Sequence, residues 1–190
     1  MLFFKYSLVA LIAFVLGCKG SKSEPPKEVA TTMLPEKAIN VKTIKEENCP
    51  ENGVCTWEIM AETNFVMKED TIDALYPVFE KEEGFDTIKF LYDRPTKKGV
   101  SDGSYRELLY FRIPSNTTTL SLKDEALQDI GLVYGRLCFC RGAAGYFPVT
   151  KGSLSLSKTT NGYTIQVNFE NGKVPQVINN LNGTTSIITR

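Results

Sequence analysis

The chain has 190 residues, and its 22 lysine and arginine residues are balanced by 22 aspartate and glutamate residues. A balanced charge offers no basic field to a phosphate backbone, and no dense cluster of lysine and arginine creates one locally, so we expect no nucleic-acid partner. The chain contains no histidine, which excludes Ser-His-Asp and Cys-His catalysis and the helical zinc motifs, and we predict neither an enzyme nor a cofactor.

An apolar run near the start of the chain ends in Val15-Leu16-Gly17-Cys18. Lys5 precedes the run, and the run is shorter than the roughly 20 residues that span a bilayer, so the layout is typical of a secretory signal peptide. The four residues resemble the lipobox of bacterial lipoprotein precursors. The resemblance implies a signal peptide over residues 1–17 and a lipid-modified Cys18 as the first mature residue.

The lipobox resemblance also implies where the protein is anchored. In that family the cysteine carries a diacylglyceryl group and its new amino group is usually acylated, and two or more chains give an anchor that persists, each buried methylene adding roughly 0.8 kcal/mol. An aspartate after the cysteine retains such proteins at the inner membrane, whereas this chain has Lys19. We therefore expect Cys18 to bind membrane lipid, with the protein in the outer membrane and facing the periplasm.

Residues 18–47 are rich in Lys, Glu, Ser, Thr and Pro. Such a segment has too few large apolar side chains to bury a core, so we predict a flexible tether. The composition and length of residues 48–190 suit one globular domain.

Alternation of apolar and polar residues dominates the chain beyond the tether. It is clearest where apolar side chains recur at every second position, at Trp57, Ile59 and Ala61, at Leu109, Phe111 and Ile113, at Leu154 and Leu156, and at Ile165, Val167 and Phe169. A period of two is typical of β-strands. Turn-forming pairs separate these segments, at Asn52-Gly53, Asp102-Gly103, Asn161-Gly162, Asn171-Gly172 and Asn182-Gly183. The pattern predicts an all-β, single-domain antiparallel sandwich or small barrel.

Two segments lack the strand pattern and could each form a short helix, Thr71–Tyr76 and Lys123–Ile130, and Gly131 is well placed to end the second. Two threonines, Thr71 and Thr87, follow an aspartate and precede an isoleucine. These triplets resemble the O-glycosylation acceptor of Bacteroidota, so both threonines are candidate modification sites.

Four cysteines remain once Cys18 is assigned to lipid, namely Cys49, Cys55, Cys138 and Cys140. An exported protein enters an oxidising compartment, so we expect all four to form disulfides. Pairing Cys49 with Cys55 is the easiest local closure, whereas Cys138 and Cys140 in a strand would have Cα atoms about 6.6 Å apart, near the upper limit for a disulfide. We favour the two local bonds, and the crossed pairing remains an alternative.

The chemically richest segment surrounds the second cysteine pair. In a strand, Tyr134, Arg136, Cys138 and Cys140 point to one face, which we expect to be the less buried side of the sheet. A neighbouring cation lowers the pKa of a thiol, so thiol redox chemistry or metal handling is an alternative function if Cys138 and Cys140 stay reduced. Because the spacing matches no standard zinc pattern, we predict no metal site.

A second alternative is glycan binding by stacking on aromatic rings. The candidate rings are Tyr105, Tyr110, Phe111, Tyr134, Tyr146 and Phe147. Aromatic residues of β-rich domains mostly pack in the core, which is the role we predict here. The function we expect is therefore binding or structural interaction in the cell envelope, with an envelope protein or a glycan as partner.

Two further stretches, residues 48–55 (Asn-Cys-Pro-Glu-Asn-Gly-Val-Cys) and residues 135–142 (Gly-Arg-Leu-Cys-Phe-Cys-Arg-Gly), occur together in this chain. Their combination resembles uncharacterised Bacteroidota-type lipoproteins. The resemblance implies the envelope location and the single β domain, and it implies no activity.

Overall fold

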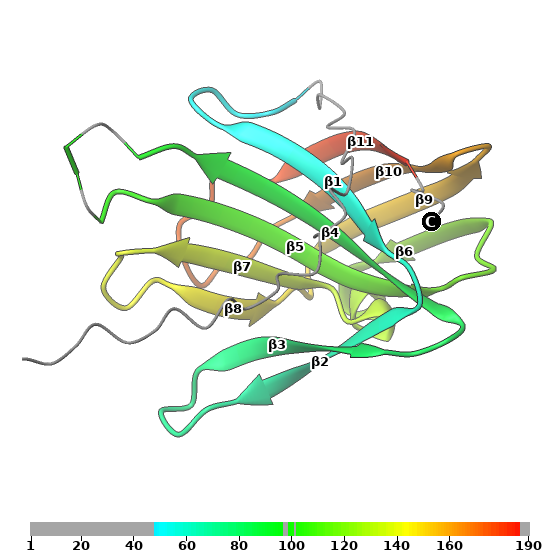
Figure 1. The fold of residues 1–190 in the computed structure, drawn as a ribbon, viewed down its shortest axis with the longest axis horizontal. Coiled ribbons are helices and arrows are strands. Elements are labelled where there is room, and N and C mark those ends of the chain that lie inside the picture. The colour runs from blue at the N-terminus through cyan, green and yellow to red at the C-terminus, as the bar shows by residue number, and fades with distance from the viewer. Residues whose placement is uncertain (1–47, 97–98, 101, 187–190) are drawn as a thin grey trace, which may run out of the picture. The chain divides into compact units, whose positions relative to one another are not determined.

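Antiparallel strands make up most of the chain that the computed structural model describes, which is residues 48–96, 99–100 and 102–186. One sheet has five strands in the order β1-β4-β5-β7-β8, a second has four in the order β11-β10-β9-β6, and β2 and β3 form a separate hairpin. The two sheets face each other and do not close into a barrel (Figure 1). The all-β prediction is confirmed, and of its two forms the structure has the sandwich.

The strands of the five-stranded sheet are β1 (Val54–Met60), β4 (Phe85–Arg94), β5 (Tyr105–Pro114), β7 (Val133–Cys138) and β8 (Gly145–Pro148). The strands of the four-stranded sheet are β6 (Thr119–Lys123), β9 (Gly152–Thr159), β10 (Gly162–Phe169) and β11 (Asn180–Ser186). The hairpin consists of β2 (Thr63–Glu69) and β3 (Leu75–Lys81). The predicted signal peptide, the lipid site Cys18 and the tether up to residue 47 lie outside the described residues.

The core lies between the two sheets, where the predicted alternation places it. Leu109, Phe111 and Ile113 of β5 are fully buried. The side chains of β9 and β10 that point inward, at every second position, face them from the other sheet. Period-two burial is clearest in β10, whose pattern alternates strictly after its first two residues. The strand predictions for these segments are therefore confirmed.

The pair Asn182-Gly183 was predicted to form a turn, and this prediction is wrong. Gly183 lies inside β11, paired with Ile165 of β10. A Cβ atom at Gly183 would lie 2.0 Å from Nε1 of the buried Trp57 indole, so the glycine is needed for close packing between the edge strands. In the sequence, a short polar pair followed by β-forming residues resembles a hairpin turn. The sequence does not reveal the contact with Trp57, because Trp57 belongs to a strand far away in the chain.

One of the two helix predictions is confirmed. A 3₁₀-helix, η1 (Asp124–Ile130), ends at Gly131 in the left-handed conformation. The segment Thr71–Tyr76 is not a helix, because residues 71–74 form the turn of the β2–β3 hairpin and β3 begins at Leu75. The Asp70 carboxylate accepts hydrogen bonds from the backbone N–H groups of Ile72 (2.8 Å) and Ala74 (2.9 Å), which favours the turn over the helix.

The hairpin covers part of the outer face of the five-stranded sheet. Phe65 of β2 and Phe79 of β3 pack on Tyr110, with ring centroids 5.9 Å and 5.3 Å from it. Leu108 and Val133 are buried in the same small cluster. The middle strands of this sheet are therefore covered on both faces. In the described part of the chain, no helix has the length and apolar character needed to cross a membrane.

Candidate functional site

Four connections meet at one end of the sandwich, which we call the loop end. It consists of these connections with the adjoining strand ends, residues 48–55, 94–107, 138–144 and 170–179, described except for 97, 98 and 101. The strand pairing brings the first three together, since the start of β1 pairs with the end of β4, and the start of β5 with the ends of β4 and β7. The loop end lies on the left of Figure 1.

Both disulfides lie at the loop end. Cys49 is bonded to Cys55 and Cys138 to Cys140, so the structure has the local pairing that we favoured. The objection to the second bond assumed a continuous strand, but β7 ends at Cys138 and the Cα atoms of Cys138 and Cys140 are only 5.2 Å apart. The thiols are paired in the structure, so a reactive thiolate here would require prior reduction.

The face that carries Arg136 and Cys138 was expected to be the less buried one, and this prediction is wrong. Tyr134 on the same face is completely buried in the core between the sheets, and Cys138 packs against that core. The guanidinium of Arg136 is satisfied internally, because Nη1 donates to the carbonyl oxygen of Ala143 (3.0 Å) and Nε to the hydroxyl of Tyr105 (3.3 Å). The first half of β7 is buried, and Arg136, Leu137 and Cys138 at its end are half-buried.

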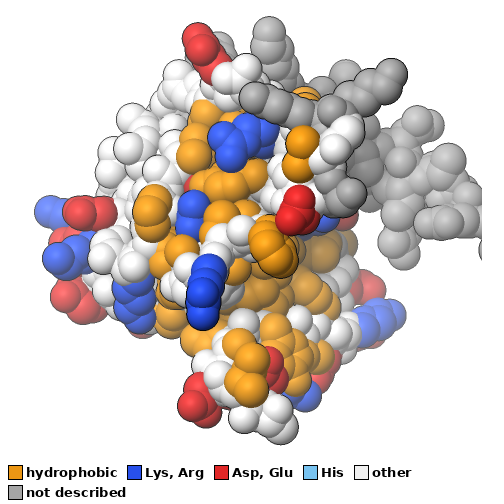
Figure 2. All heavy atoms as spheres, turned by 90° about the vertical axis from the view of Figure 1, so that its left-hand side faces the viewer, with side chains coloured by type: hydrophobic (Ala, Val, Ile, Leu, Met, Phe, Trp, Pro, Cys, Tyr) orange, Lys and Arg blue, Asp and Glu red, His pale blue; other side chains and the backbone are white. Residues whose placement is uncertain are grey.

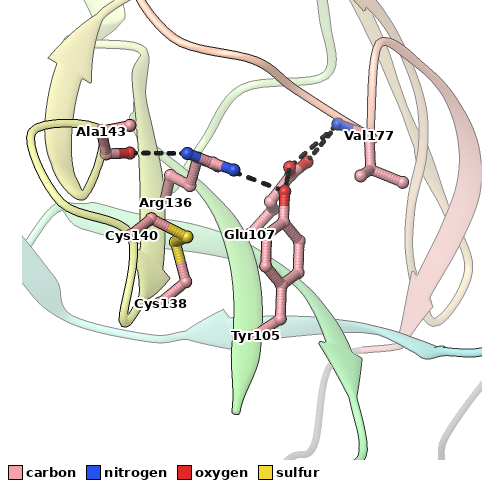
Figure 3. Close-up of a disulfide and its surroundings, with 7 residues drawn as sticks. All are labelled: Tyr105, Glu107, Arg136, Cys138, Cys140, Ala143 and Val177. Atoms are coloured by element: carbon pink, nitrogen blue, oxygen red, sulfur yellow. Dashed lines mark hydrogen bonds between the residues drawn. A yellow bond between two sulfur atoms is a disulfide. The ribbon is translucent and has the colours of Figure 1, made fainter. Parts of the chain in front are cut away.

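The most unusual residue of the loop end is Glu107, whose side chain is completely buried on the inner face of β5. Its carboxylate accepts hydrogen bonds from the backbone N–H groups of Val177 (2.9 and 3.0 Å) and Ile178 (2.8 Å), and from the hydroxyl of Tyr105. Figure 3 shows Tyr105 and Val177 on either side of this carboxylate, with Arg136 beyond the tyrosine hydroxyl. Glu107 thus joins the loop between β10 and β11 to the opposite sheet.

Burial and charge act together on the tyrosines of this cluster. Burial raises the pKa of Tyr105, the hydrogen bond from Arg136 lowers it, and the Glu107 carboxylate raises it. Burial first, and then Glu107, raise the pKa of Tyr134 well above its ordinary value. Both phenols therefore stay protonated. The Tyr105 hydroxyl donates to the carboxylate, whereas the buried Tyr134 hydroxyl has no hydrogen-bond partner among the described residues. With its lone pairs engaged by these donors and no exposed surface, Glu107 holds the fold in place and cannot reach a substrate.

The loop at residues 170–179 is also ordered from within. The Gln176 amide nitrogen donates to the carbonyl oxygens of Phe169 (3.1 Å) and Ile178 (2.9 Å), and its oxygen accepts from the Asn171 backbone N–H (2.7 Å). The predicted turn pair Asn171-Gly172 falls in this loop. Together with Glu107, Gln176 gives the loop one defined conformation.

Sequence reasoning missed Glu107, although a signal was present. Glu107 shares its strand parity with Leu109 and Phe111, so the alternation already placed a carboxylate on the face that packs against the other sheet. A buried carboxylate needs hydrogen-bond donors. Tyr105 is one such donor, but the backbone donors are some 70 residues away, and no local pattern reveals them.

The aromatic prediction is confirmed for the core. Tyr105, Tyr110, Phe111 and Tyr134 are buried, so they offer no stacking platform to a sugar. Tyr146 and Phe147 of the same set are half-buried in β8.

The two candidate glycosylation sites differ in access. Thr71 is exposed in the hairpin turn. Thr87 is completely buried in β4, and its hydroxyl donates to the carbonyl oxygen of Thr63 (2.8 Å). A glycan at Thr87 would not fit in the folded domain.

Exposed large hydrophobic side chains come from only two regions of the described chain. Four belong to the loop end, Val54, Val100, Phe139 and Val177, and four to the β2–β3 hairpin, Val66, Ile72, Tyr76 and Phe79. Phe139 is the most exposed of them, at 84%. Figure 2, which looks at this side, shows hydrophobic side chains across the middle with lysine and arginine side chains among them.

Arginines accompany these hydrophobic residues. Arg94, Arg106 and Arg141 are exposed at the loop end. The guanidinium carbon of Arg94 lies 4.2 Å from the centre of the Tyr105 ring, and Arg106 forms an ion pair with Asp93 (3.4 Å). The surface thus combines apolar tips with cationic, planar side chains, the composition that is enriched in the cores of protein interfaces.

The site contains no group that would identify a reaction. Within the described residues, no group of three or more Cys, Asp and Glu side chains is placed to hold a metal ion. Comparisons of the chain with protein-family models, with curated protein sequences and with solved structures found no match.

Proposed function

We propose that the chain is a lipid-anchored protein of the bacterial cell envelope, held in the outer membrane by Cys18 and facing the periplasm, whose β-sandwich acts by binding a partner protein at the loop end. The lipobox sequence Val15–Cys18 supports the anchor. The disulfides Cys49–Cys55 and Cys138–Cys140 support export, because such bonds persist in oxidising compartments.

The gathering of exposed hydrophobic side chains carries the binding proposal. Val54 and Phe139 are 56% and 84% exposed, each next to a disulfide, at the start of β1 and after the end of β7. Val100, which is 46% exposed, belongs to the connection between β4 and β5, the two strands that lie between β1 and β7. Removing apolar surface from water is favourable by about 25 cal/mol per Å². A group of exposed apolar side chains at one end of a domain therefore indicates a surface that another molecule covers.

Three segments of the loop end are held in place from within the domain. The disulfides close two of them, and Glu107 and Gln176 hold a third against the sheets. Binding then orders little additional chain, which limits the entropy lost on association. Rigid scaffolds that present binding loops at one end are a common use of a sandwich.

Replacing Cys18 with serine tests the anchor. We expect Cys18→Ser to leave the precursor uncut or to release the protein from membranes, because no thioether can form. Membrane fractionation and intact mass are the measurements. Lys19→Asp is the matched variant, and we expect it to stay lipidated and move to the inner membrane. Normal processing and unchanged fractionation of Cys18→Ser would contradict the anchor.

Site-specific photocrosslinking tests the binding surface. A benzoylphenylalanine at position 139 should give discrete protein adducts in intact cells, whereas the same group at Asn116, which is exposed at the other end of the sandwich, should not. Adducts are identified by mass spectrometry, and Arg141→Ala should reduce those from position 139 several-fold. Equal adducts from both positions, or none from position 139, would rule out the loop end as the interface.

A further inference from the structure

The outer face of the four-stranded sheet is nearly free of charge. Strand register aligns its outward side chains in three rows across β6, β9, β10 and β11: Thr119, Ser157, Thr164 and Thr184; Ser121, Ser155, Gln166 and Asn182; Lys123, Ser153, Asn168 and Asn180. We call this set the polar face. All but one of its side chains are hydroxyls or carboxamides, in a chain where 23% of residues are charged.

Carboxamides are concentrated at one corner of the polar face. Gln166 is paired with Asn182, and Asn168 with Asn180, so four amide side chains form a block on two adjacent strands. Neighbouring strands lie about 4.8 Å apart, and residues two apart in a strand about 6.6 Å. A carboxamide carries two N–H donors and one oxygen acceptor. The Gln166 oxygen already accepts a hydrogen bond from the Ser155 hydroxyl (3.5 Å).

Two shallow depressions meet at this block. One, of about 300 Å³, lies over the polar face itself, and Leu154 and Val167 contribute to its lining. The other, of about 830 Å³, lies beside the loop at residues 170–179 and includes Phe169 and Pro175. Asn168 and Asn180 line both depressions, so the two adjoin at the amide block, and we call them together the groove. Leu154, Val167 and Phe169 are buried beneath it, so its accessible side chains are mostly polar.

We propose that this groove is a binding site for a neutral polysaccharide. Sugar hydroxyls both donate and accept hydrogen bonds, as the amides and serine hydroxyls of the polar face do. The C–H face of a sugar ring would contact the exposed ring of Pro175, whereas Phe169 is buried in the core and contributes no stacking surface. The polar face has one cation, Lys123, at its edge, and the second depression adds one carboxylate, Glu170, and one ammonium, Lys173. The charges of Glu170 and Lys173 are opposite, so the groove has little net charge to attract an ionised ligand.

The polar face shares with the loop-end surface only the loop at residues 170–179, which borders its groove. Its residues project from the opposite sheet to the one that carries Arg94 and Phe139. The proposal does not depend on lipid anchoring, because the groove is built from the folded domain alone. Failure of either earlier proposal would leave this one standing.

Affinity electrophoresis of the full chain in a nonionic detergent tests this proposal. Gels contain hydroxyethylcellulose, amylopectin or galactomannan as neutral polysaccharides, and alginate as an acidic one. We expect at least one neutral polysaccharide to slow the protein, and Asn168→Ala/Asn180→Ala to weaken that binding about tenfold or more. Asn116→Ala, which removes an exposed amide outside the polar face, is expected to bind like the unchanged chain.

Three results would overturn the proposal. The first is that none of the three neutral polysaccharides slows the protein. The second is retardation by alginate alone, which would indicate attraction between charges. The third is unchanged retardation of the double variant, which would place the sugar site elsewhere. Circular dichroism of each variant confirms that a loss of binding is not a loss of folding.

Discussion

Replacing Glu107 with alanine is expected to lower the free energy of unfolding by about 3–5 kcal/mol. The carboxylate is completely buried and accepts hydrogen bonds from Val177, Ile178 and Tyr105. Alanine would leave buried donors without an acceptor, and each such donor costs about 1–3 kcal/mol. Urea unfolding followed by the fluorescence of the single tryptophan measures the change.

Two comparisons sharpen the Glu107 experiment. Glu107→Gln keeps the shape of the side chain and one acceptor oxygen, but its amide N–H₂ would face other donors. We therefore expect it to lower the free energy of unfolding by less than Glu107→Ala does. Glu80→Ala, at an exposed position of β3, should change stability by less than about 0.5 kcal/mol. Hydrogen exchange of the Val177 and Ile178 amides should accelerate in Glu107→Ala. Slow exchange there, with unchanged stability, would show that the carboxylate does not hold the loop.

Adding one methyl group at Gly183 is expected to destabilise the sandwich by about 1–3 kcal/mol. The new Cβ would lie 2.0 Å from Trp57 Nε1 and 2.6 Å from its Cδ1, so the indole must move. Trp57 is buried and packs on Phe90 with ring centroids 4.9 Å apart, which leaves it little room. Gly183→Ala should therefore shift both the unfolding midpoint and the emission of the native state.

A second glycine gives the control for this experiment. At Gly103 a Cβ would approach only methyl groups of Thr96 and Val100, at 3.0 Å, in an exposed connection. Gly103→Ala should leave the tryptophan emission unchanged and alter stability little, because these side chains can shift into solvent. If Gly183→Ala behaved in the same way, β11 would not pack against β1 as described.

Much of the fold was accessible from the sequence because alternation reports burial directly. Leu154 and Leu156 between serines identify an inner and an outer face without any knowledge of the partner strand. The polar residues of the same alternation identified the outward side chains of each strand. That these side chains form one nearly uncharged surface follows only from the strand register, which places Ser155 beside Gln166. The end of the 3₁₀-helix could also be predicted from the sequence, because Gly131 readily adopts the left-handed conformation found there.

The predictions that failed depended on contacts distant in sequence. Whether the Arg136 side of β7 is open depends on which strands flank it and on what covers them, and neither property is local. Asn182-Gly183 has the composition of a turn. The glycine is needed for another reason, because it packs against Trp57, a residue more than a hundred positions earlier in the chain. The helix expected at Thr71–Tyr76 failed for a local reason, since Asp70 captures backbone N–H groups that a helix would use otherwise.

The order of the strands along the chain has a consequence for the export that we propose. A chain that has crossed a membrane as far as Pro148 possesses every strand of the five-stranded sheet, but the inner face of that sheet still lacks β9, β10 and β11. Phe111 would remain uncovered, and Glu107 would still await its donors at Val177 and Ile178. The domain therefore cannot complete its core strand by strand during passage, and its final three strands decide when folding can finish.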